Sequence, residues 1–304
     1  MEKIAAVVVT YNRLELLKQC VEKLRGQTVL CQIVLVDNAS TDGTGDWARA
    51  QKDLEYQNTG KNLGGAGGFH YGMKWAVEPV SYTHLTLPGY EYLWIMDDDT
   101  LPEPDALEAL LAADRHLEGN YGWLSSVALW TDGQGCVMNR QLWAKRYATF
   151  EAHLAEGLVE ARQASFVSLF LRAETVRQVG LPISEFFIWG DDAEYTRRIQ
   201  RLSPCFVAGK SRVVHAMKEN SGIGVEKDQP GRIGRYWYAF RNEAYLYRQE
   251  GFRGVCYYIF NCLRAMARVL VKAQDHRGKR LGVILKGMWS GLFFRPKVRF
   301  CGEK

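Results

Sequence analysis

The chain has 304 residues, of which 47% are hydrophobic and 24% are charged. This length and apolar content suffice for one large domain with a buried core and a helical tail. The net charge of +5 is only mildly basic, so no nucleic-acid partner is expected. An anionic substrate or an anionic membrane surface suits such a charge.

The seven cysteines indicate neither a disulfide framework nor a zinc site, because their number is odd and no pair has the C-x-x-C spacing. A reducing cytosol is therefore the expected location. The first residues lack the basic, apolar and small-residue pattern of a signal peptide, so none is expected. Since no run of roughly 18 or more apolar residues occurs, no membrane-spanning helix is expected either.

Apolar runs and helical spacing alternate in the first part of the chain. Strands are predicted at residues 4–10, 32–36, 54–57 and 92–96, and helices at 14–25, 42–51, 68–77 and from 104 to 111. The alternation predicts an α/β fold with a mostly parallel sheet and helices on both faces. In such sheets ligands bind beyond the carboxyl ends of the strands.

The later part of the chain divides near a glycine-containing stretch at 224–234. We expect a catalytic domain at 1–224, with a nucleotide-binding part at about 1–115 and an acceptor-side part at about 116–224. Residues 225–304 are expected to form a helical, aromatic and basic C-terminal region. Residues 80–88 interrupt the passage from helix to strand and resemble the translation of a transposon end used in sequencing libraries; an ordinary surface loop is the alternative, and His84 is given no function.

Three adjacent acids, Asp97, Asp98 and Asp99, directly follow a predicted buried strand. Asp97 and Asp99 share one face of an extended backbone. Burying like charges is costly unless a cation neutralises them, and Mg²⁺ or Mn²⁺ takes such carboxylates together with diphosphate oxygens. A solvated acidic turn is the alternative. His215 follows a strand-like stretch, and a lone histidine there is more often structural than a ligand.

A second acidic pair, Asp191 and Asp192, follows the aromatic run FFIWG. A carboxylate beside apolar groups has a raised proton affinity, as a general base needs. The alternative is that both acids simply favour a helix N-terminus.

The segment NLGGAGGF at 62–69 is rich in glycine, which lets a backbone approach an anion closely. It has neither the P-loop ending nor the dinucleotide-binding position, and a flexible loop is the alternative. Arg13 and Asp37, each after a predicted strand, are weaker candidates for contact with a nucleotide; both are also ordinary turn residues.

Taken together, VVVTYNR (7–13), VDNASTDGT (36–44), NLGGAGGF, IMDDDT (95–100) and WGDDAEY (189–195) resemble glycosyltransferase family 2, of the GT-A fold. The resemblance covers about residues 4–220. NLGGAGGF, the triple aspartate and WGDDAEY together resemble the branch that contains bacterial galactofuranosyltransferases, with rhamnosyltransferases nearby.

The resemblance implies an inverting hexosyltransferase that uses Mn²⁺ or Mg²⁺ and a UDP- or dTDP-sugar donor. Asp97, Asp99 and His215 would bind the metal, Asp192 would be the catalytic base, and Asp191 would contact donor or acceptor hydroxyls. The remaining implied roles are donor and acceptor contacts: Asp37 on the pyrimidine, Trp189 on the acceptor pocket, and Thr10, Asn12, Arg13, Asn62, Gly64, Gly65, Gly68 and Asp98 around the nucleotide diphosphate.

The expected acceptor is a glycan or a lipid-linked saccharide in cell-surface polysaccharide synthesis. Aromatic and basic residues are interleaved at 236–247, 254–272 and 286–297, which suits contact with an anionic membrane at its inner face. Helices packed on the catalytic domain with a basic outer face are the equally weighted alternative. The alternative functions are a nucleotidyltransferase and a catalytically silent nucleotide-sugar-binding module.

Overall fold

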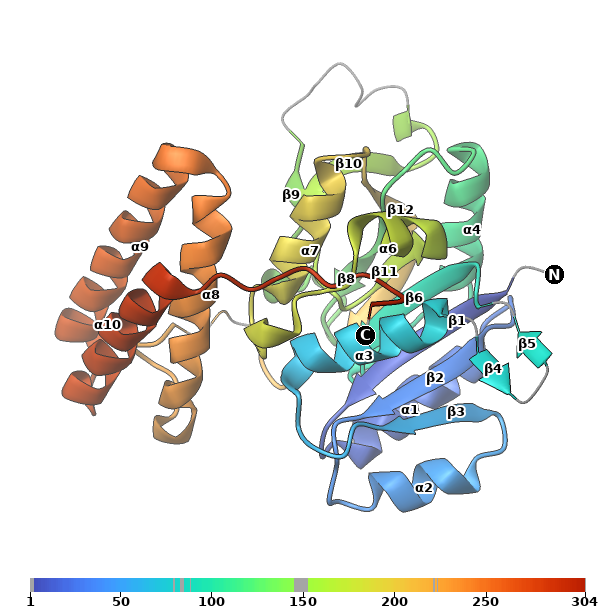
Figure 1. Ribbon diagram of the computed structural model, residues 1–304, viewed down its shortest axis with the longest axis horizontal. Coiled ribbons are helices and arrows are strands. Elements are labelled where there is room, and N and C mark those ends of the chain that lie inside the picture. The colour runs from blue at the N-terminus through green and yellow to red at the C-terminus, as the bar shows by residue number, and fades with distance from the viewer. Residues whose placement is uncertain are drawn as a thin grey trace.

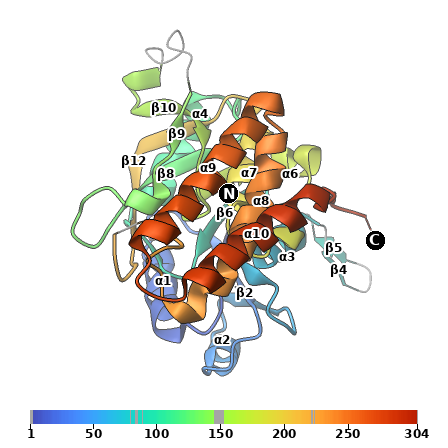
Figure 2. The same ribbon diagram turned by 90° about the vertical axis from the view of Figure 1, so that its left-hand side faces the viewer.

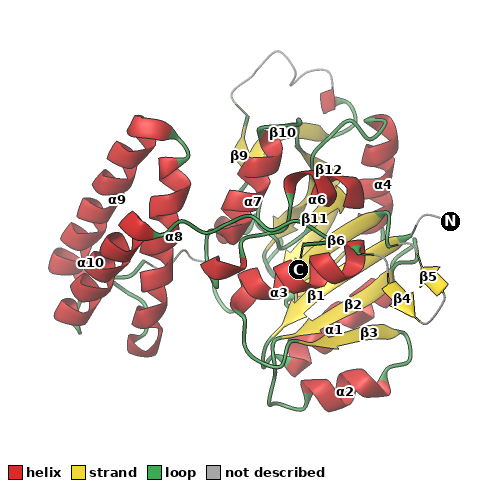
Figure 3. Cartoon of the chain, viewed as in Figure 1, coloured by secondary structure: helices red, strands yellow, loops and turns green. Residues whose placement is uncertain are grey.

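The computed structural model describes residues 3–78, 80–82, 85–87, 89–144, 153–220, 222 and 224–303. Within these residues a ten-stranded sheet is flanked by helices, and a separate group of three helices lies beside it (Figures 1 and 3). The strands at residues 4–10, 32–37, 54–58 and 92–97 run parallel to one another. The predicted α/β class with a mostly parallel sheet is therefore confirmed.

The sheet has the strand order β3-β2-β1-β6-β11-β8-β12-β10-β9, with β7 paired to β12. β1, β2, β3 and β6 run parallel, and β12 runs parallel to β8, whereas β11 is antiparallel to both of its neighbours. The strands are β1 Ile4–Thr10, β2 Gln32–Asp37, β3 Leu54–Asn58, β6 Tyr92–Asp97, β7 Thr100–Pro102, β8 Leu124–Leu129, β9 Leu142–Trp143, β10 Leu158–Gln163, β11 Leu169–Arg172 and β12 Phe206–His215.

Alternate residues of β1 belong to two hydrophobic cores on opposite faces of the sheet, because successive side chains of a strand point to opposite faces. Ala6 and Val8 belong to the cluster that contains the apolar faces of α1 and α4. Val7 and Val9 belong to the cluster that contains α3, α6 and α7. Burial on both faces explains why this strand is a continuous apolar run.

Helices pack against both faces of the sheet and carry on into the C-terminal region. They are α1 Leu14–Arg25, α2 Thr44–Ala50, α3 Gly64–Val77, α4 Ala106–His116, α6 Ala173–Val179, α7 Asp191–Gln200, α8 Tyr236–Arg248, α9 Gly251–Lys272 and α10 Arg277–Phe293, with 3₁₀ turns η1 Val137–Asn139, η3 Ser184–Phe186 and η4 Pro230–Arg235. The bounds of α1 match the prediction. α3 begins at Gly64 rather than at residue 68, so most of the glycine-rich segment is helix rather than the flexible loop that was its alternative.

The glycines of α3 let this helix approach the sheet closely. A Cβ atom at Gly68 would lie 2.5 Å from Val9 Cγ1, and one at Gly72 would lie 2.6 Å from Val7 Cγ1 and 2.7 Å from Val36 Cγ2. Such distances are far inside van der Waals contact. Packing alone therefore accounts for Gly68 and Gly72, without any ligand.

Residues 80–88 include a short antiparallel hairpin, β4 Val80–Tyr82 and β5 Leu85–Leu87. The pair forms its own two-stranded sheet, set apart from the main sheet (Figure 1). Thr83, His84 and Pro88 lie outside the described residues. Whether the segment belongs to the natural sequence stays an open interpretation.

The C-terminal helices have a core of their own. Buried residues of η4 and of α8, α9 and α10 form one cluster, against which Trp189 of the preceding part also packs. Figure 2 shows α9 and α10 in front of α8 on the side away from the sheet. The boundary at residue 224 stays a prediction.

Within the described ranges one helix, α9, is long and apolar enough to cross a membrane by length and composition alone. The expectation that no helix spans a membrane stays a prediction. Charged residues interrupt the apolar sequence of α9, so a search for an unbroken apolar run does not find this helix.

Replacing Gly72 by alanine tests the close packing of α3 on the sheet. The new methyl group must displace Val7 or Val36, and we expect a loss of about 1–3 kcal/mol in the free energy of unfolding. Gly65→Ala is the matched control, because a Cβ atom at this position meets nothing within 4 Å. Replacing a helical glycine by alanine without a clash should raise the free energy of unfolding by about 0.5–1 kcal/mol. Urea unfolding measures both; a Gly72→Ala variant as stable as Gly65→Ala would contradict the packing argument.

Candidate active site

Three neighbouring strands bring acidic and polar side chains to one edge of the sheet. Thr10 of β1 pairs with Asp37 of β2, and Val9 pairs with Asp97 of β6. The chain then turns through Asp98 and Asp99 into β7. Because β7 pairs antiparallel with β12, Thr100 lies opposite His215 and the histidine comes beside the acidic turn.

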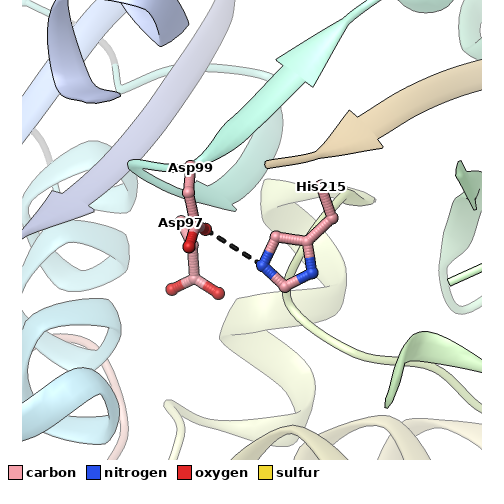
Figure 4. Close-up of side chains that lie close together, drawn as sticks. All are labelled: Asp97, Asp99 and His215. Atoms are coloured by element: carbon pink, nitrogen blue, oxygen red, sulfur yellow. Dashed lines mark hydrogen bonds and ion pairs between the residues drawn. The ribbon is translucent and has the colours of Figure 1, made fainter. Parts of the chain in front are cut away.

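Asp97, Asp99 and His215 converge on one point (Figure 4). One ligand atom from each lies within 4.8 Å of the other two. His215 Nε2 is 3.0 Å from Asp99 Oδ1. Two hard carboxylate oxygens and one imidazole nitrogen are a donor set that suits Mn²⁺ and, less well, Mg²⁺.

Burial is the largest influence on the pKa of each of these acids. Burial, reinforced by the Asp99 charge, raises the pKa of Asp97 to about 7. Burial opposes ionisation of Asp99 too, but His215 and Arg13 outweigh it and hold its pKa below the ordinary value. The hydrogen bond and charge of Asp99 in turn outweigh burial at His215 and raise its pKa. A bound cation would satisfy the remaining need for positive charge.

Asn139 fixes the orientation of the His215 ring. Its Oδ1 lies 2.7 Å from His215 Nδ1 and its Nδ2 donates to Ser165 Oγ at 2.9 Å. The thiol of Cys136 also donates to Asn139 Oδ1, at 2.9 Å. With Nδ1–H directed at Asn139, Nε2 is the nitrogen that faces the acids. No sequence pattern indicates Asn139, because it lies in a segment with neither helical nor strand periodicity.

Arg13 and Thr10 bind the middle acid of the turn. Thr10 Oγ1 donates to Asp98 Oδ2 at 2.7 Å. Arg13 Nη1 lies 3.3 Å from Asp98 Oδ1 and 2.6 Å from Asp99 Oδ2. Burial still raises the pKa of Asp98 to about 6, against the effect of Arg13. The Arg13 side chain is 48% exposed, so this cation faces both the acids and the solvent.

Asp37 is completely buried, and other polar groups already bond both of its oxygens. Oδ1 accepts from the Ser40 amide at 2.8 Å, and Oδ2 accepts from Tyr56 Oη at 2.8 Å and from Asn58 Nδ2 at 3.3 Å. Contact with a pyrimidine therefore requires Tyr56 or Asn58 to move aside. Both residues come from β3, which extends one residue beyond the strand predicted at 54–57.

Two asparagines brace the loops around this edge. Asn12, at a φ of 53°, accepts from the Thr41 amide at 2.7 Å and links the loop after β1 to the loop after β2. Asn62 accepts from the Gly64 amide at 2.8 Å, where α3 begins. Asn38, not identified from the sequence, donates to the Gly64 carbonyl at 3.0 Å. Gly65 has open space beside it, which leaves room for a ligand.

The second acidic pair begins α7 after a strained loop. Phe187 and Trp189 have φ angles of 63° and 64°, and Gly190 follows at 86°. Burial, with the Asp192 charge second, raises the pKa of Asp191 well above its ordinary value, and burial raises that of Asp192 to about 6. The charge of Asp97 also raises the pKa of Asp191. The two acidic groups are therefore close enough to interact electrostatically.

The C-terminal helix α8 holds this strained loop in place. Asn242 is fully buried, and its Nδ2 donates to the carbonyls of Phe186, Ile188 and Trp189 at 3.0, 3.1 and 2.8 Å. Arg241 donates to the Glu185 carbonyl at 2.5 Å. The sequence analysis assigned no part of the tail to the site, so it missed both residues.

The comparisons with known proteins agree with the motifs. Residues 5–121 match the family model described as Glycosyl transferase family 2. Galactofuranosyltransferase GlfT1 of Mycobacterium tuberculosis H37Rv is 27% identical over 271 residues, which cover 83% of this chain and 84% of that protein. The Mycolicibacterium smegmatis protein of the same name is 26% identical over 83% of this chain and 85% of its own. An undecaprenyl-phosphate mannosyltransferase of Micrococcus luteus is 34% identical over 37% of this chain and 44% of its own.

Solved structures share the fold at low sequence identity. The crystal structure of GalNAc-T7 with UDP, GalNAc and Mn²⁺ has a TM-score of 0.55 at 14% identity, over 80% of this chain and 50% of that one. The mannosyltransferase PcManGT from Pyrobaculum calidifontis, in complex with GDP-Man and Mn²⁺, has a TM-score of 0.52 at 16% identity, over 95% of this chain and 75% of that one. The GT-A fold is confirmed.

The chain therefore carries a glycosyltransferase family 2 domain, and its enzyme class is glycosyltransferase, as the motifs predicted. This class replaces the nucleotidyltransferase and silent-module alternatives.

Replacing Asn242 by leucine tests whether α8 holds the loop before α7. The substitution keeps the volume but removes the hydrogen bonds that Asn242 donates to three loop carbonyls, and we expect a loss of about 1–3 kcal/mol in the free energy of unfolding. The transfer rate should fall, because the loop carries Asp191 and Asp192. Asn261→Leu on the neighbouring α9 is the control. Wild-type stability and kcat in Asn242→Leu would rule out this role.

Proposed function

We propose that the protein is an inverting, metal-dependent hexosyltransferase that takes a sugar from a UDP- or dTDP-linked donor. Galactofuranose is the favoured sugar, supported by the galactofuranosyltransferase relatives that align with 83% of the chain, and rhamnose is the second. The observation that carries the proposal is the cluster of Asp97, Asp99 and His215 at the end of β6, and a second acidic pair at the start of α7, where the Asp97 charge raises the pKa of Asp191, supports it.

Asp97, Asp99 and His215 would hold Mn²⁺ or Mg²⁺. Their three ligand atoms are mutually close, and the raised pKa of Asp97 marks a carboxylate without enough counter-charge. A bound cation would neutralise the negative charge that develops on the leaving diphosphate. Arg13, paired with Asp98 and Asp99 but half exposed, would add a second positive charge beside the phosphates.

Asp192 would act as the catalytic base. Its carboxylate accepts the proton of an acceptor hydroxyl as that oxygen bonds to the anomeric carbon. The bond between the anomeric carbon and the diphosphate oxygen breaks at the same time, on the opposite face, so the configuration inverts. A pKa raised to about 6 suits a base that works near neutral pH. Asp191 would contact sugar hydroxyls, and Trp189 would form a wall of the acceptor pocket.

The donor would lie over the ends of β1 and β2. Asp37 would accept a hydrogen bond from the imide N–H of uracil or thymine once Tyr56 or Asn58 has moved. Thr10, Asn12, Asn62, Gly64 and Gly65 would shape the surrounding loops. Gly68 would contribute through the packing of α3 on Val9 rather than through contact with the donor.

The acceptor would be a glycan or a lipid-linked saccharide in cell-surface polysaccharide synthesis. We place the enzyme in the cytoplasm, in contact with the inner face of an anionic membrane. The acceptor would then bind to the acceptor-side part at about 116–224. The membrane would bind to the helical region from 225.

Asp192→Asn tests the base directly. We expect transfer to fall on the order of 10²–10⁴-fold, because the amide cannot take the proton, while calorimetric binding of the donor is unchanged. In the unsubstituted enzyme, kcat/KM should fall as the pH drops through about 6, where Asp192 becomes protonated. Release of nucleoside diphosphate from a panel of nucleotide sugars measures both.

The control for that test is Asp105→Asn, at an exposed site next to α4. Undiminished turnover in Asp192→Asn would rule out the assignment of the base.

Asn139→Ala tests the metal site without touching a ligand. Loss of the group that orients a metal-binding histidine usually weakens metal binding about 10–100-fold. Titration of Mn²⁺ followed by electron paramagnetic resonance measures this, with Asn261→Ala as the control. UDP or dTDP should also bind more tightly with Mn²⁺ than with EDTA. Equal nucleotide affinity in the two conditions would contradict the metal site.

A further inference from the structure

Helix α9 carries two apolar stripes on opposite sides. The inner stripe consists of Tyr258, Cys262 and Val269, which are buried in the C-terminal cluster. The outer stripe has the same helical spacing but points to solvent. Its members are Phe252, Ile259, Phe260, Leu263, Leu270 and Val271, which are between 44% and 83% exposed. Only one apolar stripe is needed for a helix to pack on a soluble domain.

Helix α10 extends this apolar surface. Leu285, Trp289, Leu292 and Phe293 are between 54% and 68% exposed and recur at helical spacing, opposite the buried Val283, Ile284, Gly287 and Gly291. Both helices lie on the side of the group that Figure 2 presents to the viewer. We call the exposed apolar side chains of α9 and α10 the outer face. An exposed apolar area of this extent marks a binding surface rather than a random scatter of side chains.

The charged side chains of α9 and α10 are all positive. Neither α9 nor α10 contains an aspartate or a glutamate. Arg253 and Arg264 lie along one edge of the α9 stripe and Lys279 and Lys286 along one edge of the α10 stripe, and all four are exposed. A purely cationic border around an apolar surface is complementary to anionic headgroups over acyl chains.

The packing of α9 favours a helix that lies on a membrane over one that crosses it. Its inner stripe is fixed to α8, where Tyr258 Oη donates to the Phe240 carbonyl at 2.9 Å. Arg268 forms an ion pair with the buried Glu226. Gly287 and Gly291 of α10 pack against Phe240 and Ala244 of α8. Crossing the bilayer would break these contacts and place Arg264 and Arg268 in the hydrocarbon region.

We infer that the outer face docks the protein onto an anionic lipid bilayer, an inference that rests on the proposed transfer to a lipid-linked acceptor. A second copy of the chain fits less well, because a two-fold contact would set the same cations against each other. The inference also connects the membrane to the site. The helix that supports the outer face, α8, is the helix that holds the loop before Asp191 and Asp192.

Flotation of the full chain with lipid vesicles tests the inference. We expect the protein to float with phosphatidylglycerol vesicles and at least tenfold less with phosphatidylcholine vesicles. The double substitution Leu263→Glu with Trp289→Glu should abolish flotation, and Arg264→Gln with Lys286→Gln should weaken it on the order of tenfold. Leu202→Glu is the control, since Leu202 is 70% exposed but lies after α7, away from the outer face.

Sedimentation and nucleotide release complete the test. A dimer that the double glutamate variant converts to a monomer would assign the outer face to a second copy and overturn the inference. So would wild-type protein that fails to float, or that floats equally with both lipids. Release of nucleoside diphosphate with a water-soluble acceptor should be the same in the double glutamate variant and in wild type. Its absence from wild type would refute the proposed function, whatever the flotation result.

Discussion

Three consecutive carboxylates at the end of a buried strand impose the requirement around which the rest of the site is built. Burial disfavours the charged form of each, and the charge of Asp99 further raises the pKa of Asp97 and of Asp98. Two side chains pair with Asp99: Arg13 from the loop after β1 and His215 from the end of β12. The pKa of Asp97 nonetheless stays at about 7, so these two groups leave a deficit of positive charge. A divalent cation with a diphosphate fits that deficit.

The C-terminal helices support the candidate active site as well as forming the last part of the chain. Phe187, Trp189 and Gly190 all have left-handed backbone conformations, which the first two adopt only at a cost in free energy. Asn242 offsets that cost through three carbonyl groups of the loop. The start of α7, and with it Asp192, is therefore positioned by a helix that lies more than forty residues later in the chain. This arrangement connects the proposed base to the helices that carry the outer face.

The sequence predicted the parts of the structure that depend on local pattern. Apolar runs located β1, β2 and β6, and strand-end acids located the metal candidates, because parallel strands end at a common edge. The family resemblance added the place of His215, which periodicity alone could not give. The sequence did not predict the roles of Asn139 and Asn242, because each acts through a tertiary contact that no local pattern encodes. The resemblance implies ligand contacts for the glycines of NLGGAGGF, and no local pattern shows that Gly68 lets α3 pack closely on Val9.

A crystal structure of the protein with Mn²⁺ and UDP or dTDP tests the central claim most directly. Anomalous diffraction near the manganese edge locates the ion independently of the protein coordinates. The account predicts one peak bounded by Asp97, Asp99 and His215, with diphosphate oxygens completing its coordination and Arg13 beside the phosphates. A nucleotide bound at the ends of β1 and β2 with no anomalous peak among these three residues would contradict it.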